Sequence, residues 1–278
     1  MSFPLIPDDR EGDVHNLEAL PRSELTVFMA GNQFMVVPDL IQAFKEKHPE
    51  VGDIFYETLP PGLELRQILA GGARFRGVDH YIRADVYSSV SKKAMRELEA
   101  AGLIRKDDYF LYLYNRLALM VKKGNPKGIS SVLDLARSDV VVSQPSTGLE
   151  HIADYILDMY RKAGGEALVG RVTREKVQEG TTLMTTVHHR ETPERILEGK
   201  ADVGPVWQTE IRAALNSGLD IQGVDVGPDL DQHEDINYYI TRLKNGKNPK
   251  NAARFLEFIK SPRAASLFAA CGFVPESF

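Results

Sequence analysis

The stretch Leu25-Thr-Val-Phe-Met-Ala-Gly-Asn32 decides how this chain folds. Its apolar and partly β-branched residues, followed by Gly-Asn, predict a short buried strand that ends in a turn. Apolar residues then recur at helical spacing, at Val37, Leu40, Ile41 and Phe44. His48-Pro49 ends this pattern. A strand, a turn and a helix in direct succession form the repeating unit of an α/β fold.

The same alternation continues as far as residue 102. Ile54-Phe-Tyr56 is a second expected strand, and Pro60-Pro61-Gly62 is a tight turn that leads into a helix. Ala84-Asp-Val-Tyr-Ser88 is a third strand, after which Ser91 caps a helix that ends at Gly102. The expected fold class is therefore α/β, with a mainly parallel sheet flanked by helices.

A second sheet is expected beyond residue 116. Residues 116–122 form a long apolar strand that we expect to cross into a second lobe, and residues 236–241, rich in Tyr and Ile, are expected to cross back. Further predicted elements are strands at 140–143 and 202–207 and helices from 152 to 164, from 193 to 199, from 249 to 260 and from 263 to 270. We predict a polar N-terminal arm at 1–23, a discontinuous lobe 1 at 24–118 and 238–278, and lobe 2 at 119–237.

The composition is that of a globular protein. The 278 residues are enough for two α/β domains, and 43% of them are hydrophobic while 26% are charged. The formal net charge of −5 argues against a nucleic-acid binder, which must neutralise phosphates with Lys and Arg. Cys271 is the single cysteine, so an intrachain disulfide and a Cys-based zinc site are both excluded.

Targeting signals leave the compartment open. No apolar run reaches the roughly 18 to 20 residues that span a bilayer, so no membrane insertion is expected. The N-terminus lacks the basic-then-apolar pattern of a secretory signal. The protein is therefore expected to be periplasmic or extracellular after removal of a signal, or alternatively cytoplasmic.

Several motifs in this order resemble a known family. They are Leu25-Thr-Val-Phe-Met-Ala-Gly-Asn32, Leu65-Arg-Gln-Ile68, Ala84-Asp-Val-Tyr-Ser-Ser-Val-Ser-Lys-Lys-Ala-Met95, Asn115-Arg-Leu-Ala-Leu-Met-Val-Lys122, Asp202-Val-Gly-Pro-Val-Trp207, Phe255-Leu-Glu-Phe-Ile-Lys-Ser-Pro262 and Cys271-Gly-Phe273. The chain resembles the type II periplasmic substrate-binding proteins of ABC transporters, in particular their molybdate- and tungstate-binding branch.

This resemblance implies a two-lobed fold whose lobes are joined by two crossing strands. The ligand would be a small oxyanion, molybdate- or tungstate-like or sulfate, held in a cleft between the lobes for uptake through an ABC permease. The resemblance also implies a monomer without a cofactor and without enzymatic activity. In such sheets the pocket lies at helix N-termini, whose unpaired N–H groups can hold an anion.

The resemblance assigns candidate ligand-binding residues by position. The family's first anion-holding hydroxyl falls on Asn32, with a simple N-cap as the alternative. The second falls on Pro61 and Gly62, which offer only backbone N–H groups, with Thr58 as a nearby substitute. Two further positions are Ser146 with Thr147, which could instead form a capping box with Glu150, and Trp207, which could instead only pack.

The turn Val187-His-His-Arg-Glu-Thr-Pro193 is the most informative local feature. His188, His189 and Arg190 bring three donors to the start of a helix and could clamp an anion. A solvated polar loop is one alternative, and a metal site that uses His188, His189 and Glu191 is another. For the whole protein, a cytosolic ligand sensor and an enzyme on the same scaffold are the rival hypotheses, although no nucleophile elbow, P-loop or paired-carboxylate motif is present.

Overall fold

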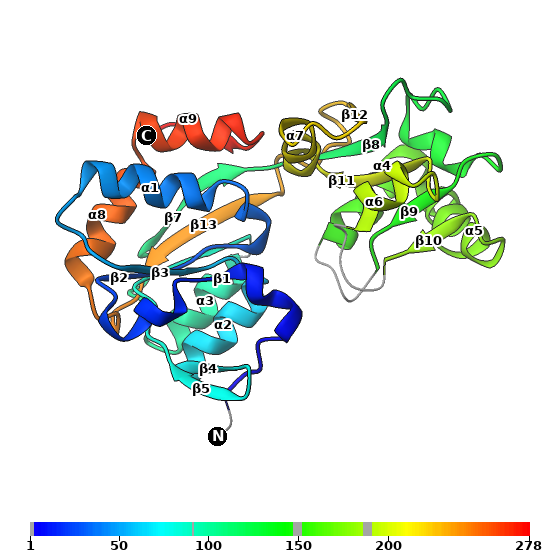
Figure 1. Ribbon diagram of the computed structural model, residues 1–278. Coiled ribbons are helices and arrows are strands. Elements are labelled where there is room, and N and C mark those ends of the chain that lie inside the picture. Colours follow the sequence, from blue (N-terminus) through cyan, green and yellow to red (C-terminus); the bar gives the residue numbers. More distant parts are fainter. Residues whose placement is uncertain (1–2, 91, 147–151, 186–190) are drawn as a thin grey trace. The chain divides into compact units, whose positions relative to one another are not determined.

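The chain forms two compact units. The computed structural model describes residues 3–90, 92–146, 152–185 and 191–278. Unit 1 comprises Met1–Tyr114 and Asn237–Phe278, and unit 2 comprises Asn115–Ile236 (Figure 1). The strand expected as the first crossing lies wholly in unit 2, whereas most of residues 236–241 lie in unit 1.

Unit 1 contains a seven-stranded sheet in the order β1-β3-β2-β6-β13-β7-β14. Its strands are β1 (Val14–His15), β2 (Leu25–Phe28), β3 (Ile54–Glu57), β6 (Val86–Ser89), β7 (Tyr109–Tyr114), β13 (Asn237–Arg242) and β14 (Val274–Pro275). β2 runs parallel to β3 and β6, while β13 runs antiparallel to both β6 and β7. Every residue of β2, β3 and β6 is buried, because helices cover both faces of these strands.

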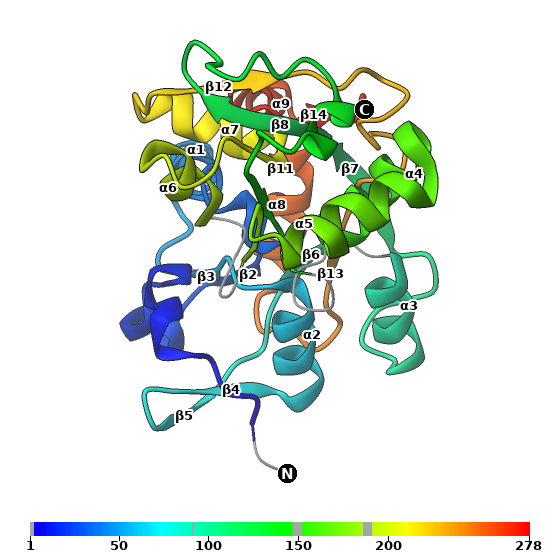
Figure 2. The same ribbon diagram turned by 90° about the vertical axis from the view of Figure 1, so that its right-hand side faces the viewer.

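Helices cover the two faces of this sheet. The helices α1 (Val37–Lys47) and α9 (Pro262–Ala270) lie on one face, together with α8 (Pro249–Ile259), and α2 (Pro61–Ala70) and α3 (Lys92–Ala100) lie on the other (Figure 1 and Figure 2). Phe44 of α1 contacts Phe255 and Phe258 of α8 edge to face, at 5.2 and 5.7 Å between ring centroids. On the other face, Leu65 and Leu98 belong to one apolar cluster with strand residues of the sheet.

The segment expected as a polar N-terminal arm is part of unit 1. It forms the 3₁₀ turns η1 (Asp8–Asp13) and η2 (Leu17–Arg22), and β1 between them pairs with β3. Ile6 and Leu20 are 1% and 6% exposed and belong to the same cluster as α2 and α3. The polar composition of the segment concealed these two apolar anchors, whose burial fixes it to the domain.

Unit 2 contains a five-stranded sheet in the order β10-β9-β11-β8-β12. Its strands are β8 (Leu117–Lys122), β9 (Val142–Gln144), β10 (Thr182–Met184), β11 (Val203–Trp207) and β12 (Ile221–Val224). β9, β10 and β11 are parallel, whereas β8 and β12 are antiparallel to their neighbours. Ala118 and Met120 of β8 share a core with α6 (Glu191–Leu197) and α7 (Gln208–Asn216).

Other parts of unit 2 complete its packing. The long helix α4 (Ile152–Gly170) contacts β11, kinks at Gly164 and Gly165 and continues through a π-helical turn (Arg171–Glu175) into α5 (Lys176–Gln178). A Cβ atom at Gly204 of β11 would lie 2.4 Å from Thr192 Cγ2 of α6. Only glycine at this position therefore allows α6 to approach the sheet so closely.

The predicted fold class, α/β with sheets flanked by helices, is confirmed. The parallel arrangement is limited to β3-β2-β6 and β10-β9-β11, and the other strand pairs in both sheets are antiparallel. No element was predicted at β7, β10, α7 or β12, or at the hairpin of β4 (Gly72–Phe75) and β5 (Val78–Tyr81).

Asp85 forms hydrogen bonds that link the sheet of unit 1 to the start of α8, so replacing this residue should destabilise the fold. Its fully buried carboxylate accepts hydrogen bonds from the backbone N–H groups of Thr26 (2.8 Å) and Asn248 (2.7 Å) and from Asn248 Nδ2 (3.1 Å). Asp85→Ala would orphan these donors, and we expect it to lower the free energy of unfolding by about 3 kcal/mol or more. Urea denaturation measures this. Asp79→Ala, an exposed control in the same unit, should change it by less than about 1 kcal/mol; equal losses in the two variants would contradict the assignment.

Candidate functional site

The turns that follow the parallel strands gather at one edge of the unit 1 sheet. β2, β3 and β6 run in the same direction, so their carboxyl ends lie at a common edge. The amino end of β13 lies there too, because β13 is antiparallel to β6. In open α/β sheets this is the edge at which ligands bind.

Gly31 brings two of these turns into direct contact. A Cβ atom at Gly31 would lie 3.0 Å from the carbonyl oxygens of both Thr58 and Leu59. A side chain would therefore push the turn after β2 away from the turn after β3. The contact places Asn32 and the Pro61-Gly62 turn, two expected parts of the ligand site, at the same edge.

Asn32 points its amide to the returning strand. It lies in a short 3₁₀ turn (Gly31–Gln33), and its Nδ2 donates a hydrogen bond to the Tyr238 hydroxyl at the start of β13. Its Oδ1 is buried and has no hydrogen-bond partner among the described residues. The N-cap of α1 is Val36, so Asn32 does not cap this helix.

The first turn of α2 presents one unused backbone donor. Pro61 has no N–H, and the N–H groups of Leu63 and Glu64 both donate to the Pro60 carbonyl, at 2.8 and 3.1 Å. The Gly62 N–H therefore remains without a partner among the described residues, and Gly62 is exposed. Thr58, the possible substitute, is buried, and its hydroxyl donates to Asp13 Oδ1 at 3.3 Å.

Two carboxyl groups are buried next to this turn. Glu57 at the end of β3 accepts a hydrogen bond from Gln67 Nε2 at 2.9 Å, and Glu64 of α2 accepts one from the Leu59 N–H at 3.1 Å. Burial raises the pKa of Glu57 to about 8, and burial together with the neighbouring Glu57 also raises the pKa of Glu64. At neutral pH Glu57 is thus mainly uncharged and adds little negative charge near the turn.

A polar network that the sequence did not reveal fixes Gln33, the neighbour of Asn32. Gln33 Nε2 donates to the Tyr112 hydroxyl of β7 at 2.6 Å, and the Ser88 hydroxyl of β6 lies 2.6 Å from the same oxygen. All three side chains are almost fully buried. Because the network spans three separate chain segments, no local sequence pattern announces it.

The corresponding edge of unit 2 carries the remaining expected residues. The carboxyl ends of the parallel strands β9, β10 and β11 lie there, together with the amino end of the antiparallel β8. Ser146 follows β9 and is half-buried; its N–H donates to Thr185 Oγ1 at 3.0 Å and its hydroxyl donates to the Thr185 carbonyl. Thr147, His188, His189 and Arg190 lie outside the described residues.

Arg195 anchors α6 at this edge. Its guanidinium donates to the carbonyl oxygens of Leu183 and Met184, at 2.9 and 3.0 Å, and to Glu191 Oε2 at 2.7 Å. Glu191, an alternative metal ligand, thus forms an ion pair with Arg195. Within the ranges that the structure describes, no group of three or more His, Cys, Asp or Glu residues could hold a metal ion.

Trp207 both packs and retains a donor. It is 3% exposed, and its ring contacts Tyr155 of α4 edge to face with 5.8 Å between centroids. Its indole N–H donates to none of the described residues, and its nitrogen is not one of the buried polar atoms that lack a partner in the described part of the chain, so solvent or a ligand can reach it. Beside it, Asn115 Nδ2 donates to Thr209 Oγ1 at 3.2 Å. The two interpretations of Trp207, packing and ligand contact, are therefore compatible.

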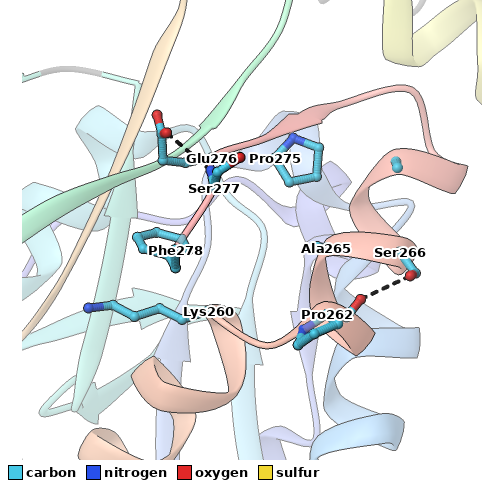
Figure 3. A pocket seen from close by; sticks show the side chains of 9 residues that line it. Lys260, Pro262, Ala265, Ser266, Pro275, Glu276, Ser277 and Phe278 are labelled. Carbon is cyan, nitrogen blue, oxygen red and sulfur yellow. Dashed lines mark hydrogen bonds between the residues drawn. The ribbon is translucent and has the colours of Figure 1, made fainter.

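A pocket of unit 1, next to α9, does not suit an anion. Its volume is about 530 Å³, and α9 and the C-terminal segment line it, including Lys260, Glu276 and Phe278 (Figure 3). The Lys260 ammonium lies over the Phe110 ring at 4.0 Å and the Phe278 ring at 5.2 Å. This cation is already engaged, and Glu276 would repel an anion, so we do not assign the ligand to this pocket.

Comparison with known proteins identifies relatives over most of the chain. Residues 25–274 match the family model of the bacterial extracellular solute-binding proteins. A Bacillus subtilis (strain 168) protein, YvgL, provisionally named an ABC transporter substrate-binding lipoprotein, is 24% identical over 214 residues, which are 74% of each chain. The sulfate-binding protein of Synechococcus elongatus is 24% identical over 247 residues, covering 84% of this chain and 69% of the relative.

A solved structure shares the fold. The substrate-binding domain of a transporter from Clostridium difficile, provisionally named a molybdenum ABC transporter, superposes with a TM-score of 0.69 at 18% identity. The match covers 91% of this chain and 99% of that one. Across the described parts of this chain, no helix is long and apolar enough to cross a membrane.

The buried Glu57 predicts a pH-dependent stability. Its pKa is raised on folding, so between about pH 5 and pH 8 the folded state keeps a proton that the unfolded chain releases. Its contribution to the free energy of unfolding should therefore fall as pH rises through this window, by up to about 1.4 kcal/mol per pH unit. In Glu57→Gln, which keeps an acceptor for Gln67, urea denaturation at pH 5 to 8 should show a flatter profile. Glu97→Gln, an exposed control, should follow the parent; parallel profiles for Glu57→Gln and the parent would refute the assignment.

Proposed function

This chain belongs to the bacterial extracellular solute-binding protein family, and on that premise we propose that it binds a small oxyanion of the molybdate, tungstate or sulfate type for uptake by an ABC transporter. The resemblance predicted from the motifs is thereby confirmed at the level of the family. The family consists of extracellular substrate-binding proteins for transport, not of enzymes.

Unpaired neutral donors at the strand-end edges carry the proposal. The exposed Gly62 N–H at the start of α2 and the Trp207 indole N–H donate to no described residue. Helix N-termini attract anions through their partial positive charge, so a chain with a net charge of −5 can still hold one. The raised pKa of Glu57 supports this, because the protonated carboxyl places little negative charge near the start of α2.

Further residues would complete the ligand's hydrogen-bond partners. Asn32, at the same edge as the Pro61-Gly62 turn, is proposed to contribute from unit 1, and Ser146 with Thr147 from unit 2. His188, His189 and Arg190 are proposed to add donors from the turn before α6. An oxyanion that offers several acceptor oxygens suits such a set of donors.

The proposed partner and compartment follow from transport. We infer that a membrane permease of the ABC type recognises the ligand-loaded protein, which would act as a monomer outside the cytoplasmic membrane. The relatives named as a substrate-binding lipoprotein and as a sulfate-binding protein support this inference.

Direct titration tests the ligand class. Trp207 is the single tryptophan of the chain, so its fluorescence should change when a ligand binds beside it. Molybdate, tungstate, sulfate and phosphate are each titrated at constant ionic strength, with fluorescence and calorimetric heat as readouts. We expect saturable binding of at least one of the first three anions, with chloride as the control. No response to any of them would exclude the oxyanion proposal.

Trp207→Phe separates packing from ligand contact. Phenylalanine can keep the ring contact with Tyr155 but has no N–H, so the thermal midpoint should stay near that of the parent. Losing a hydrogen bond to a charged ligand should weaken binding about tenfold or more, measured by calorimetry. An unchanged affinity in a stably folded variant would mean that Trp207 only packs.

A further inference from the structure

Arg116 occupies a fixed position at the edge of unit 2. Its backbone N–H donates to Asn115 Oδ1 at 2.9 Å, and its carbonyl accepts a hydrogen bond from the Gln208 N–H at 2.9 Å. The next residue, Leu117, pairs with Trp207 across the β8–β11 ladder. The backbone of Arg116 is thus held from both sides, directly beside the strand end that carries Trp207.

The side chain of Arg116 differs from the other enclosed cations of unit 2. Arg195 donates to several carbonyl and carboxylate oxygens, and the fully buried Lys176 donates to the carbonyls of Arg137 and Val140. Arg116 is half-buried, yet its Nε is buried without a partner, and its guanidinium forms no hydrogen bond or ion pair with any described residue. A cation with a purely structural role would be expected to have such partners.

The Nε of Arg116, buried without an acceptor, is unfavourable for the protein alone. Burying a donor without an acceptor destabilises the folded state. A donor that is costly in the free protein, on a residue whose backbone adjoins the strand end of Trp207, is best explained by a ligand that supplies the missing acceptor.

We propose that Arg116 is a ligand-binding residue whose guanidinium supplies a formal positive charge and pairs with oxygens of the bound oxyanion. This inference rests on the proposed function and adds one residue to its site. A planar guanidinium binds two oxygens of one anion at once, and its charge favours a dianion over a monoanion or a neutral solute.

Binding measurements on matched variants test the role of Arg116. Sulfate and molybdate are titrated by calorimetry into the parent, Arg116→Gln, Arg116→Lys and the control Arg212→Gln, which removes the same charge from an exposed position on α7. We expect Arg116→Gln to bind about tenfold to hundredfold more weakly and Arg116→Lys to lie between it and the parent. Arg212→Gln should bind like the parent. Added NaCl should weaken the parent more than Arg116→Gln.

Stability of the ligand-free protein gives an independent readout. Arg116→Met removes an unpaired cation, so its thermal midpoint should equal or exceed that of the parent, whereas Arg195→Met should lower it because it breaks several hydrogen bonds. A lowered midpoint for Arg116→Met, or unchanged anion affinity in Arg116→Gln while the parent binds, overturns the role of Arg116 alone. A parent that binds neither anion overturns the proposed function, and the assignment of Arg116 to such a ligand with it.

Discussion

The return of the chain through β13 is the constraint on which the rest of the structure depends. β13 forms antiparallel ladders with β6 on one side and β7 on the other, so the sheet of unit 1 is completed by a strand that follows unit 2 in the sequence. The direction of β13 also sets where the chain leaves and re-enters unit 1. Tyr114 and Asn237 are paired neighbours, and both lie at the edge that carries Asn32 and Gly62. The connections between the units and the candidate ligand residues of unit 1 thus share one edge.

The proposed binding of an anion by this acidic protein depends on local groups and not on net charge. The donors at the strand ends are a backbone N–H and an indole N–H, neither of which carries a formal charge. The two arginines Arg116 and Arg195 of unit 2 differ in their partners. The Arg195 guanidinium donates hydrogen bonds that fix α6, whereas the Arg116 side chain has no partner among the described residues. Screening by salt affects such close, partly buried interactions less than it affects exposed charges.

The sequence predicted the strands whose residues are uniformly apolar and the helices with clear periodicity, because burial leaves a local pattern there. It did not predict β7, although the Tyr-Phe-Leu-Tyr-Leu-Tyr sequence of this strand is rich in residues that favour strands. For the site, the pattern predicted the ends of β2, β3 and β11, and the family resemblance assigned Asn32, Gly62 and Trp207 there as candidates. It could not identify the Gln33–Ser88–Tyr112 network or Arg116, because these depend on which distant segments meet, and Arg116 was part of a stretch interpreted only as a crossing strand.

The two glycines at the edge of unit 1 constrain future variation in opposite ways. At Gly31 a Cβ atom would lie 3.0 Å from two carbonyl oxygens of the neighbouring turn, so any side chain there would force this turn to shift. At Gly62 a Cβ atom would meet nothing within 4 Å, and the backbone conformation is that of an ordinary helix start. A serine at residue 62 would therefore fit without altering the fold, and it would add a hydroxyl beside the N–H group of the same residue, which donates to no described residue.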